Sequence, residues 1–137
     1  MKYKYTKGYN LKVLEWQTLL NNFNQSVLSG NMIKHNPLGF FVSHDAHFIP
    51  ELKNVLDDLK CSIAHLYFNI TLNGKTFGRH NDTMDVWFWN CQGQTKWIME
   101  DNKSFVLNPG DLIYVSKNTY HEVVPLSPRA GISMSKE

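Results

Sequence analysis

The sequence has few cysteines, no long apolar run and no concentration of charge, and each absence excludes a class of protein. Cys61 and Cys91 are the only cysteines in 137 residues, so we expect reduced, partly buried thiols rather than a disulfide-built domain. No hydrophobic leader follows Met1, and no apolar run approaches the roughly 20 residues that cross a bilayer. We therefore expect a soluble, cytoplasmic protein with no membrane partner. The formal net charge is +2, with Lys and Arg scattered, so there is no strong nucleic-acid signal.

The chain does contain ample material for one folded core. Its hydrophobic share is 42%, with four Trp, six Tyr and eight Phe, and its length suits one domain rather than two. We expect a single domain over residues 1–137, in which 1–60 form a mostly helical cover and 61–137 form a β core.

Two helices are predicted in the first part of the chain. The first covers residues 11–27 and ends near Ser29-Gly30, because its apolar positions recur at helical spacing. The second covers about 50–60, with Pro50 in its first turn. The stretch between them is expected to be irregular. The apolar positions of the first helix are Leu11, Leu14, Leu19, Leu20, Phe23 and Val27.

Short strands at even intervals are predicted in the remainder. The first ends in a turn at Asn73-Gly74, and Gly, Pro, Asn or Asp separates the others. This pattern indicates a mainly β fold, a sandwich or barrel, with the helices packed outside it. The predicted strands cover residues 62–72, 86–91, 95–100, 104–107, 111–115, 122–124 and 131–135.

Three residues form a candidate metal site. His80 and Asp82 are two positions apart, so in an extended segment both side chains point to the same face. His121 begins a strand after a Pro-Gly-Asp turn and supplies a third ligand if the barrel brings it opposite the pair. Two His and one carboxylate are the ligands of non-haem Fe(II) oxygenases. A His-x-Asp pair on its own is more often a polar turn.

The residues around this pair resemble the metal-site region of the JmjC-like and ribosomal-oxygenase-like cupins. Those proteins read His-x-Asp-x-x-Asp-x-Phe-x-x-Gln-x-x-Gly-x-Lys-x-Trp. Residues 80–97 match this pattern at five positions, and Trp87 and Asn90 replace the Phe and the Gln. Residues 108–123 resemble the second cupin motif, in which Pro-Gly-Asp opens a strand and a His follows. The identical positions are His80, Asp82, Asp85, Gly93 and Trp97.

The resemblance implies a double-stranded β-helix, the cupin or jelly-roll fold. It also implies that His80, Asp82 and His121 bind Fe(II) as the catalytic centre. In this family 2-oxoglutarate and dioxygen are used to hydroxylate or demethylate a substrate. The substrate itself, whether protein, nucleotide or small molecule, is not indicated.

One departure from the family concerns the residue that grips the far carboxylate of 2-oxoglutarate. The family's Lys falls on Thr95 here, and the adjacent Lys96 should point to the opposite face unless a bulge intervenes. Arg129 resembles the carboxylate-binding Arg of other 2-oxoglutarate oxygenases, and a guanidinium suits a carboxylate. Those enzymes often have Ser two positions after the Arg, where this chain has Gly131. Arg129 and Lys96 both remain candidates.

Tyr67 and Asn69 are further candidates for binding the cosubstrate, because the equivalent strand of related cupins lends polar contacts to it. Asp85 is expected to orient a metal ligand, as the acid in related cupins does, with the capping of a turn as the alternative. Two other functions stay open. One is a metal-binding cupin without 2-oxoglutarate chemistry, and the other is an inactive binding module.

The remaining histidines and aromatic residues have plainer interpretations. His44-Asp45-Ala46-His47 is expected to be a solvated loop, and His65 a hydrogen-bonded interior or surface residue. The aromatic side chains are expected to be core rather than pocket lining, with Phe88 on the opposite face from its two neighbours. This aromatic set comprises Trp87, Phe88, Trp89, Trp97 and Tyr120.

Overall fold

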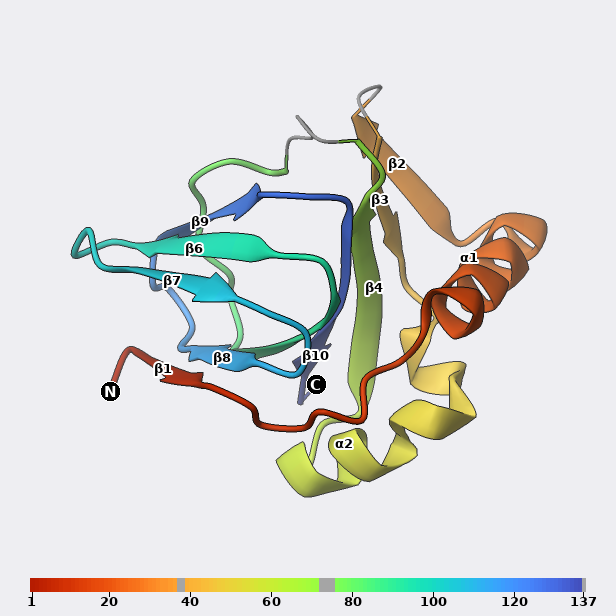
Figure 1. Ribbon diagram of the computed structural model, residues 1–137, viewed down its shortest axis with the longest axis horizontal. Helices are drawn as coiled ribbons and strands as arrows, with labels where there is room; N and C mark the ends of the chain where they lie inside the picture. Colours follow the sequence, from red (N-terminus) through yellow and green to blue (C-terminus); the bar gives the residue numbers. More distant parts are fainter. Residues whose placement is uncertain (37–38, 72–75, 137) are drawn as a thin grey trace.

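Two antiparallel sheets face each other in the computed structural model, which describes residues 1–36, 39–71 and 76–136 (Figure 1). The seven-stranded sheet contains, in spatial order, β1 (Tyr3–Thr6), β8 (Leu112–Val115), β5 (Val86–Gln92), β10 (Arg129–Ser135), β4 (Ile63–Asn69), β3 (Phe40–Ser43) and β2 (Met32–Asn36). The three-stranded sheet contains β7 (Ser104–Leu107), β6 (Thr95–Met99) and β9 (His121–Pro125).

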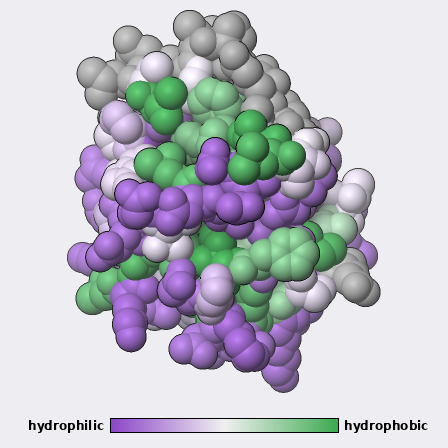
Figure 2. All heavy atoms as spheres, turned by 90° about the vertical axis from the view of Figure 1, so that its right-hand side faces the viewer, coloured by the Kyte–Doolittle hydropathy of each residue, from purple (hydrophilic) through white to green (hydrophobic). Residues whose placement is uncertain are grey.

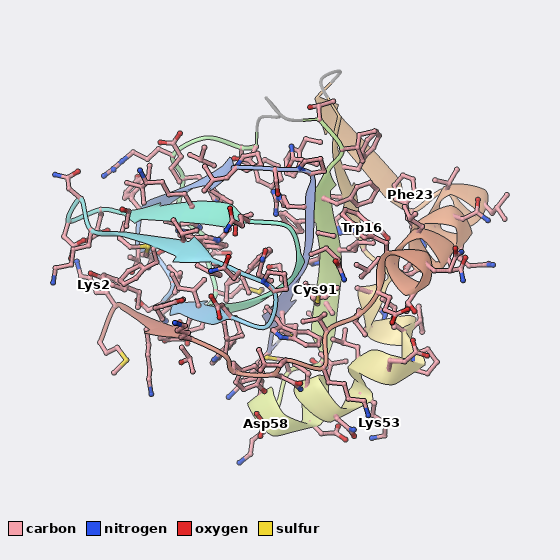
Figure 3. The ribbon with its side chains drawn as sticks, viewed as in Figure 1. Lys2, Trp16, Phe23, Lys53, Asp58 and Cys91 are labelled. Carbon is pink, nitrogen blue, oxygen red and sulfur yellow. The ribbon has the colours of Figure 1, made fainter. Side chains whose placement is uncertain are left out.

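The helices lie outside the large sheet, on the side away from the small sheet (Figure 1). They are α1 (Trp16–Ser29) and α2 (Lys53–Leu59), and the short 3-10 helices η1 (Ala46–Phe48) and η2 (Pro50–Leu52) precede α2. Trp16 and Phe23 point from α1 toward the sheet (Figure 3). The expectation of a mainly β fold with helices packed outside is confirmed.

The large sheet is covered on both faces because its strands alternate between two cores. In β10, Ala130, Ile132 and Met134 are fully buried against the helix side. Arg129 and Ser133, on the other alternation, line an interior cavity between the sheets. The core between the sheets consists of Phe88, Trp97, Met99, Leu107, Ile113 and Val115. This alternation sets which side chains can meet inside the barrel.

The first helix begins later than predicted. Residues 11–15 are not helical, and α1 starts at Trp16. Side chains from the sheet bind the backbone of this segment, because Trp89 Nε1 donates to the Asn10 carbonyl and Gln92 Nε2 donates to the Leu14 carbonyl. Leu11 is exposed as a result. The end of the helix was predicted correctly, since Gly30 caps it in the left-handed conformation.

The stretch expected to be irregular contains strands β2 and β3, which pair with each other and extend the sheet beyond β4. Strand β1, which pairs with β8, was also missed. Both errors share a cause, because short edge strands depend on tertiary pairing more than on local pattern. The helix predicted at 50–60 is confirmed as η2 and α2 together.

The predicted strands from 62 onward all exist, with ends shifted by a few residues. Strand β4 ends at Asn69, and the turn expected at Asn73-Gly74 lies outside the described residues. Cys61 and Cys91 are both free and buried, as expected. Burial raises the pKa of Cys61 to about 11 and that of Cys91 to about 12, so both thiols are poor nucleophiles.

The helix side of the molecule mixes apolar and polar surface (Figure 2). Leu20, Val27 and Leu28 of α1 are among the exposed apolar side chains, so the apolar face predicted for this helix is only partly buried. No helix within the described residues has the length and apolar character of a membrane span.

Gly131 is required by the close approach of an aromatic ring. A Cβ atom at this position would lie 2.2 Å from Cζ of Phe88 and 3.0 Å from the Trp89 carbonyl oxygen. Phe88 therefore occupies the space that a side chain at position 131 would need.

Gly131→Ala is therefore expected to lower the free energy of unfolding by about 1–3 kcal/mol, as overpacking does in other cores. Chemical denaturation measures this change. Ser133→Ala, on the same face of β10, is the control and should have a smaller effect. Equal stability of Gly131→Ala and the wild type would contradict the crowding described here.

Candidate metal centre

The barrel brings His80, Asp82 and His121 together. One ligand atom from each lies within 4.8 Å of the others, and no other group of three such residues is found in the described part of the chain. Asp82 stands between the two imidazoles, with 3.8 Å from Oδ1 to His80 Nε2 and 3.5 Å from Oδ2 to His121 Nε2. The three residues predicted from the sequence thus share one site.

Backbone pairing fixes the two histidines relative to each other. His80 and His121 form an isolated antiparallel bridge and exchange two N–H to carbonyl hydrogen bonds of 2.9 and 2.8 Å. The Asn118 N–H donates to the Asp82 carbonyl. The segment that carries the His-x-Asp pair is therefore attached directly to the segment that precedes β9.

The hydrogen bonds of the imidazoles also suit metal binding. Nδ1 of His80 lies 2.8 Å from the Gly78 carbonyl oxygen, and Nδ1 of His121 lies 2.9 Å from the Thr119 carbonyl oxygen. A carbonyl only accepts, so each Nδ1 carries a proton, and it is Nε2 that is left to present a lone pair to a metal. Burial lowers the pKa of His121 below its usual value, which favours the neutral form that a metal requires.

The residues fit a divalent cation. Ligand atoms about 2.1 Å from one ion, at right angles to each other, lie roughly 3 Å apart, so the two distances from Asp82 to the imidazoles, 3.8 and 3.5 Å, need to shorten by less than about 1 Å. His121 is almost fully buried, whereas Asp82 is 37% exposed at its side chain. All three side chains line the cavity between the sheets, where further ligands of an ion would have room.

Arg129 lines the same cavity as the triad. It is 1% exposed, its Nε donates to Asn69 Oδ1 at 2.8 Å, and its Nη1 is buried without a hydrogen-bond partner among the described residues. Its guanidinium lies over the rings of Phe40 and Phe88. Burial lowers the pKa of Arg129 to about 10, so it still carries its charge at neutral pH.

No carboxylate in the described part of the chain forms an ion pair with the charged guanidinium of Arg129. A buried charge is costly unless it is paired, and an anion in the cavity would supply the missing partner. The arrangement therefore combines a metal-binding face and a cationic anchor in one cavity.

Tyr67 also lines this cavity. Burial and the charge of Asp82 raise the pKa of Tyr67, Arg129 opposes the rise, and the result is a pKa of about 12. The hydroxyl is therefore protonated at neutral pH and can donate a hydrogen bond. Asn69 is not a lining residue; its amide oxygen holds Arg129 in position.

Thr95 and Lys96 lie elsewhere. Thr95 is fully buried and its hydroxyl donates to Asn90 Oδ1 at 3.4 Å. The pairing of β6 with β7 and with β9 has a continuous register. No bulge therefore turns the Lys96 side chain to the face of β6 that carries Trp97. Neither residue lines the cavity, and of the candidate carboxylate anchors only Arg129 does.

The structure contradicts two expectations for residues outside the triad, one for Asp85 and one for the segment at His44. Asp85 does not contact the triad; its Oδ1 accepts from the Lys117 N–H, so it caps the turn before His121, which was the alternative. The segment at His44 is not a solvated loop, because Ala46 is fully buried in η1 and His44 contacts His65.

Aromatic side chains form much of the cavity wall. Trp97 stacks on His121 with 5.4 Å between ring centroids, and Phe88 lies against Trp97. Both were expected to be core, and they are buried, but they also line the cavity. Trp97 Nε1 has no hydrogen-bond partner among the described residues. Alternation along β6 could have indicated this role, since Trp97 shares a face with buried residues only.

The sequence itself has no match: no protein-family model and no curated protein matches it. Solved structures do match. The ribosomal oxygenase YcfD from Escherichia coli, in complex with cobalt and 2-oxoglutarate, has a TM-score of 0.76 at 14% identity, over 97% of this chain and 47% of YcfD. This chain thus spans about half the length of YcfD.

Two shorter proteins match with lower scores. A cupin superfamily protein from Desulfitobacterium hafniense has a TM-score of 0.56 at 12% identity, over 76% of this chain and 83% of that one. KdgF from Halomonas sp. has a TM-score of 0.54 at 18% identity, over 77% and 88%. At these identities the likeness concerns the fold. The chain has the mainly β cupin fold, with its helices outside the barrel.

Proposed function

We propose that this chain is an Fe(II)- and 2-oxoglutarate-dependent oxygenase. The observation that carries the proposal is the buried guanidinium of Arg129, which lines the same cavity as His80, Asp82 and His121 and has no counter-ion among the residues that the structure describes. A metal with two His and one carboxylate is the non-haem oxygenase arrangement. The dicarboxylate 2-oxoglutarate has one end to bind the metal and another to pair with a cation.

Each residue then has a specific role. His80, Asp82 and His121 hold the iron, and the carbonyls of Gly78 and Thr119 keep both imidazoles in the required tautomer. Arg129, held by Asn69, binds the far carboxylate. The aromatic wall excludes water from the site. Bound iron and 2-oxoglutarate supply the oxidation, in which one oxygen atom of dioxygen enters succinate, carbon dioxide leaves, and the other oxygen atom enters the substrate.

YcfD supports this proposal as a structural neighbour, since it was solved with cobalt and 2-oxoglutarate and has the same fold over 97% of this chain. In the proposed enzyme Fe(II) is the native metal, dioxygen and 2-oxoglutarate are the reactants, and residues 1–137 form one domain. Hydroxylation and demethylation both follow from the same chemistry, and a protein, nucleotide or small molecule each remains a candidate substrate.

Tyr67→Phe is expected to weaken 2-oxoglutarate binding by roughly tenfold, because a hydrogen bond to a charged group contributes about 1.5–3 kcal/mol. Calorimetric titration of the Fe(II)-loaded protein in the absence of oxygen measures this change. Tyr114→Phe is the control, because Tyr114 lines a groove separate from the cavity. Unchanged affinity in Tyr67→Phe would remove Tyr67 from the cosubstrate site.

One observation favours a second function, a metal-binding cupin without 2-oxoglutarate chemistry. The position of the family's Lys is taken by Thr95, which is bound to Asn90. Succinate formation distinguishes the two functions. Fe(II)-loaded protein in air, with ascorbate to supply the two electrons that reduce the second oxygen atom to water when no substrate is present, should convert 2-oxoglutarate to succinate and carbon dioxide, and Asp82→Ala should not. Iron binding without consumption of 2-oxoglutarate would favour the second function and contradict the first.

A further inference from the structure

His44 and His65 form a close imidazole pair that is separate from the triad. Their Nδ1 atoms are 2.9 Å apart and their rings are nearly perpendicular, at 89° with 4.6 Å between centroids. The sheet fixes this contact, because Ser43 pairs with Leu66 and the next position along places His44 beside His65. Neither histidine lines the cavity between the sheets.

The separation of the two nitrogens suits one metal ion. Imidazole nitrogens bind Zn²⁺ at about 2.0–2.1 Å. Two such bonds at a right angle place the nitrogens about 2.9 Å apart, and a tetrahedral angle places them about 3.3–3.4 Å apart. The observed 2.9 Å therefore matches two adjacent ligands, with a shift of only about 0.4 Å needed for tetrahedral geometry.

A third imidazole, that of His47, belongs to the same stretch of chain, although its nitrogens do not come within 4.8 Å of both partners. His47, three residues after His44 and in η1, has a buried Nδ1 without a hydrogen-bond partner among the described residues. The nearest carboxylate in sequence, Asp45, is already bound by Ser26 and Asn31. The pair thus lacks an acidic partner that would favour protonated imidazolium.

The surroundings of His65 favour its neutral form. Burial, together with the proximity of His44 and His47, lowers the pKa of His65 to about 4. A neutral imidazole has a free lone pair, which is the form that binds metals. Imidazole nitrogen suits Zn²⁺, Cu²⁺ and Ni²⁺ better than Mg²⁺ or Ca²⁺.

We propose that His44 and His65 form a second metal site, for a divalent ion of the Zn²⁺, Cu²⁺ or Ni²⁺ class. Water completes the coordination. The bound ion connects the end of β3 to β4 and so stabilises the pairing of these two strands. This site does not depend on the proposed oxygenase activity.

Zinc titration in a protein without the triad tests the proposal. The background is the double variant His80→Ala/Asp82→Ala, without a histidine tag and freed of metal by a chelator. Isothermal titration with Zn²⁺ should show one equivalent bound. His65→Asn in this background should weaken binding at least tenfold, because the amide can replace the Nδ1 hydrogen bond but is a poor ligand for zinc.

His47→Ala serves as the comparison and should reduce the affinity less than His65→Asn does. Histidine side-chain NMR of the triad-free protein gives a second measurement that needs no substitution at the pair. As Ni²⁺ is added, the signals of His44 and His65 should broaden before those of the other histidines. The proposal is overturned if the triad-free protein binds no Zn²⁺, or if His65→Asn binds it as tightly. In either case the two imidazoles form a hydrogen-bonded pair only.

Discussion

Asp82→Ala is expected to weaken Fe(II) binding by at least roughly 100-fold and to abolish 2-oxoglutarate turnover. Losing a residue that merely orients a ligand typically costs 10–100-fold in metal affinity or activity, so losing a ligand should cost more. Asp82 lies between the two imidazoles and is the only carboxylate of the triad. Its side chain is 37% exposed, so the variant should fold, and calorimetric titration with Fe(II) in the absence of oxygen measures the loss.

Asp85→Ala is the matched control. This carboxylate lies three residues further along the same segment, but it accepts from the Lys117 N–H and does not touch the triad. The control should keep the iron affinity of the wild type. If Asp82→Ala bound iron as tightly as Asp85→Ala, the proposed ligand set would be wrong.

Arg129→Met should separate cosubstrate binding from folding. We expect the affinity for 2-oxoglutarate to fall by roughly 100-fold or more, since two hydrogen bonds to a charged group contribute about 1.5–3 kcal/mol each. Iron binding should be unchanged, because Arg129 is not a ligand. Methionine has a similar length and removes a buried unpaired charge, so the free energy of unfolding without 2-oxoglutarate should not fall by more than about 1 kcal/mol.

Arg79→Met is the comparison for this variant. Arg79 is exposed and lies over the ring of Tyr120, outside the cavity, so its loss should leave 2-oxoglutarate affinity unchanged. Calorimetric titration of both variants measures their affinity for 2-oxoglutarate, and chemical denaturation measures their free energy of unfolding. A strongly destabilised Arg129→Met with normal 2-oxoglutarate affinity would assign the guanidinium a structural role.

The local sequence predicts the parts of the site that depend on spacing and turns. His80 and Asp82 fall two positions apart, and the Pro-Gly-Asp turn sets up the segment before His121. The structure shows why that turn needs its aspartate: Asp111 accepts from the Asn108 and Gly8 N–H groups and from the Tyr5 hydroxyl. Such short-range constraints leave a clear pattern in the sequence.

Features that depend on contacts between distant segments were not predictable in this way. The contact of Arg129 with Asn69, the crowding of Gly131 by Phe88 and the contact of His44 with His65 each involve two separate segments of the chain. The same applies to strand β1, whose pairing with β8 brings together residues more than 100 positions apart. Pattern and propensity describe one segment at a time, whereas these features arise from the packing of several.

The most direct test of the oxygenase proposal is the visible spectrum of the Fe(II)-loaded protein as 2-oxoglutarate is added without oxygen. A cosubstrate that binds the iron gives a metal-to-ligand charge-transfer band. We expect this band in the wild type, its loss in His80→Ala, and its appearance only at higher 2-oxoglutarate concentration in Arg129→Met. A protein that binds iron but shows no band at saturating 2-oxoglutarate would contradict the proposed function.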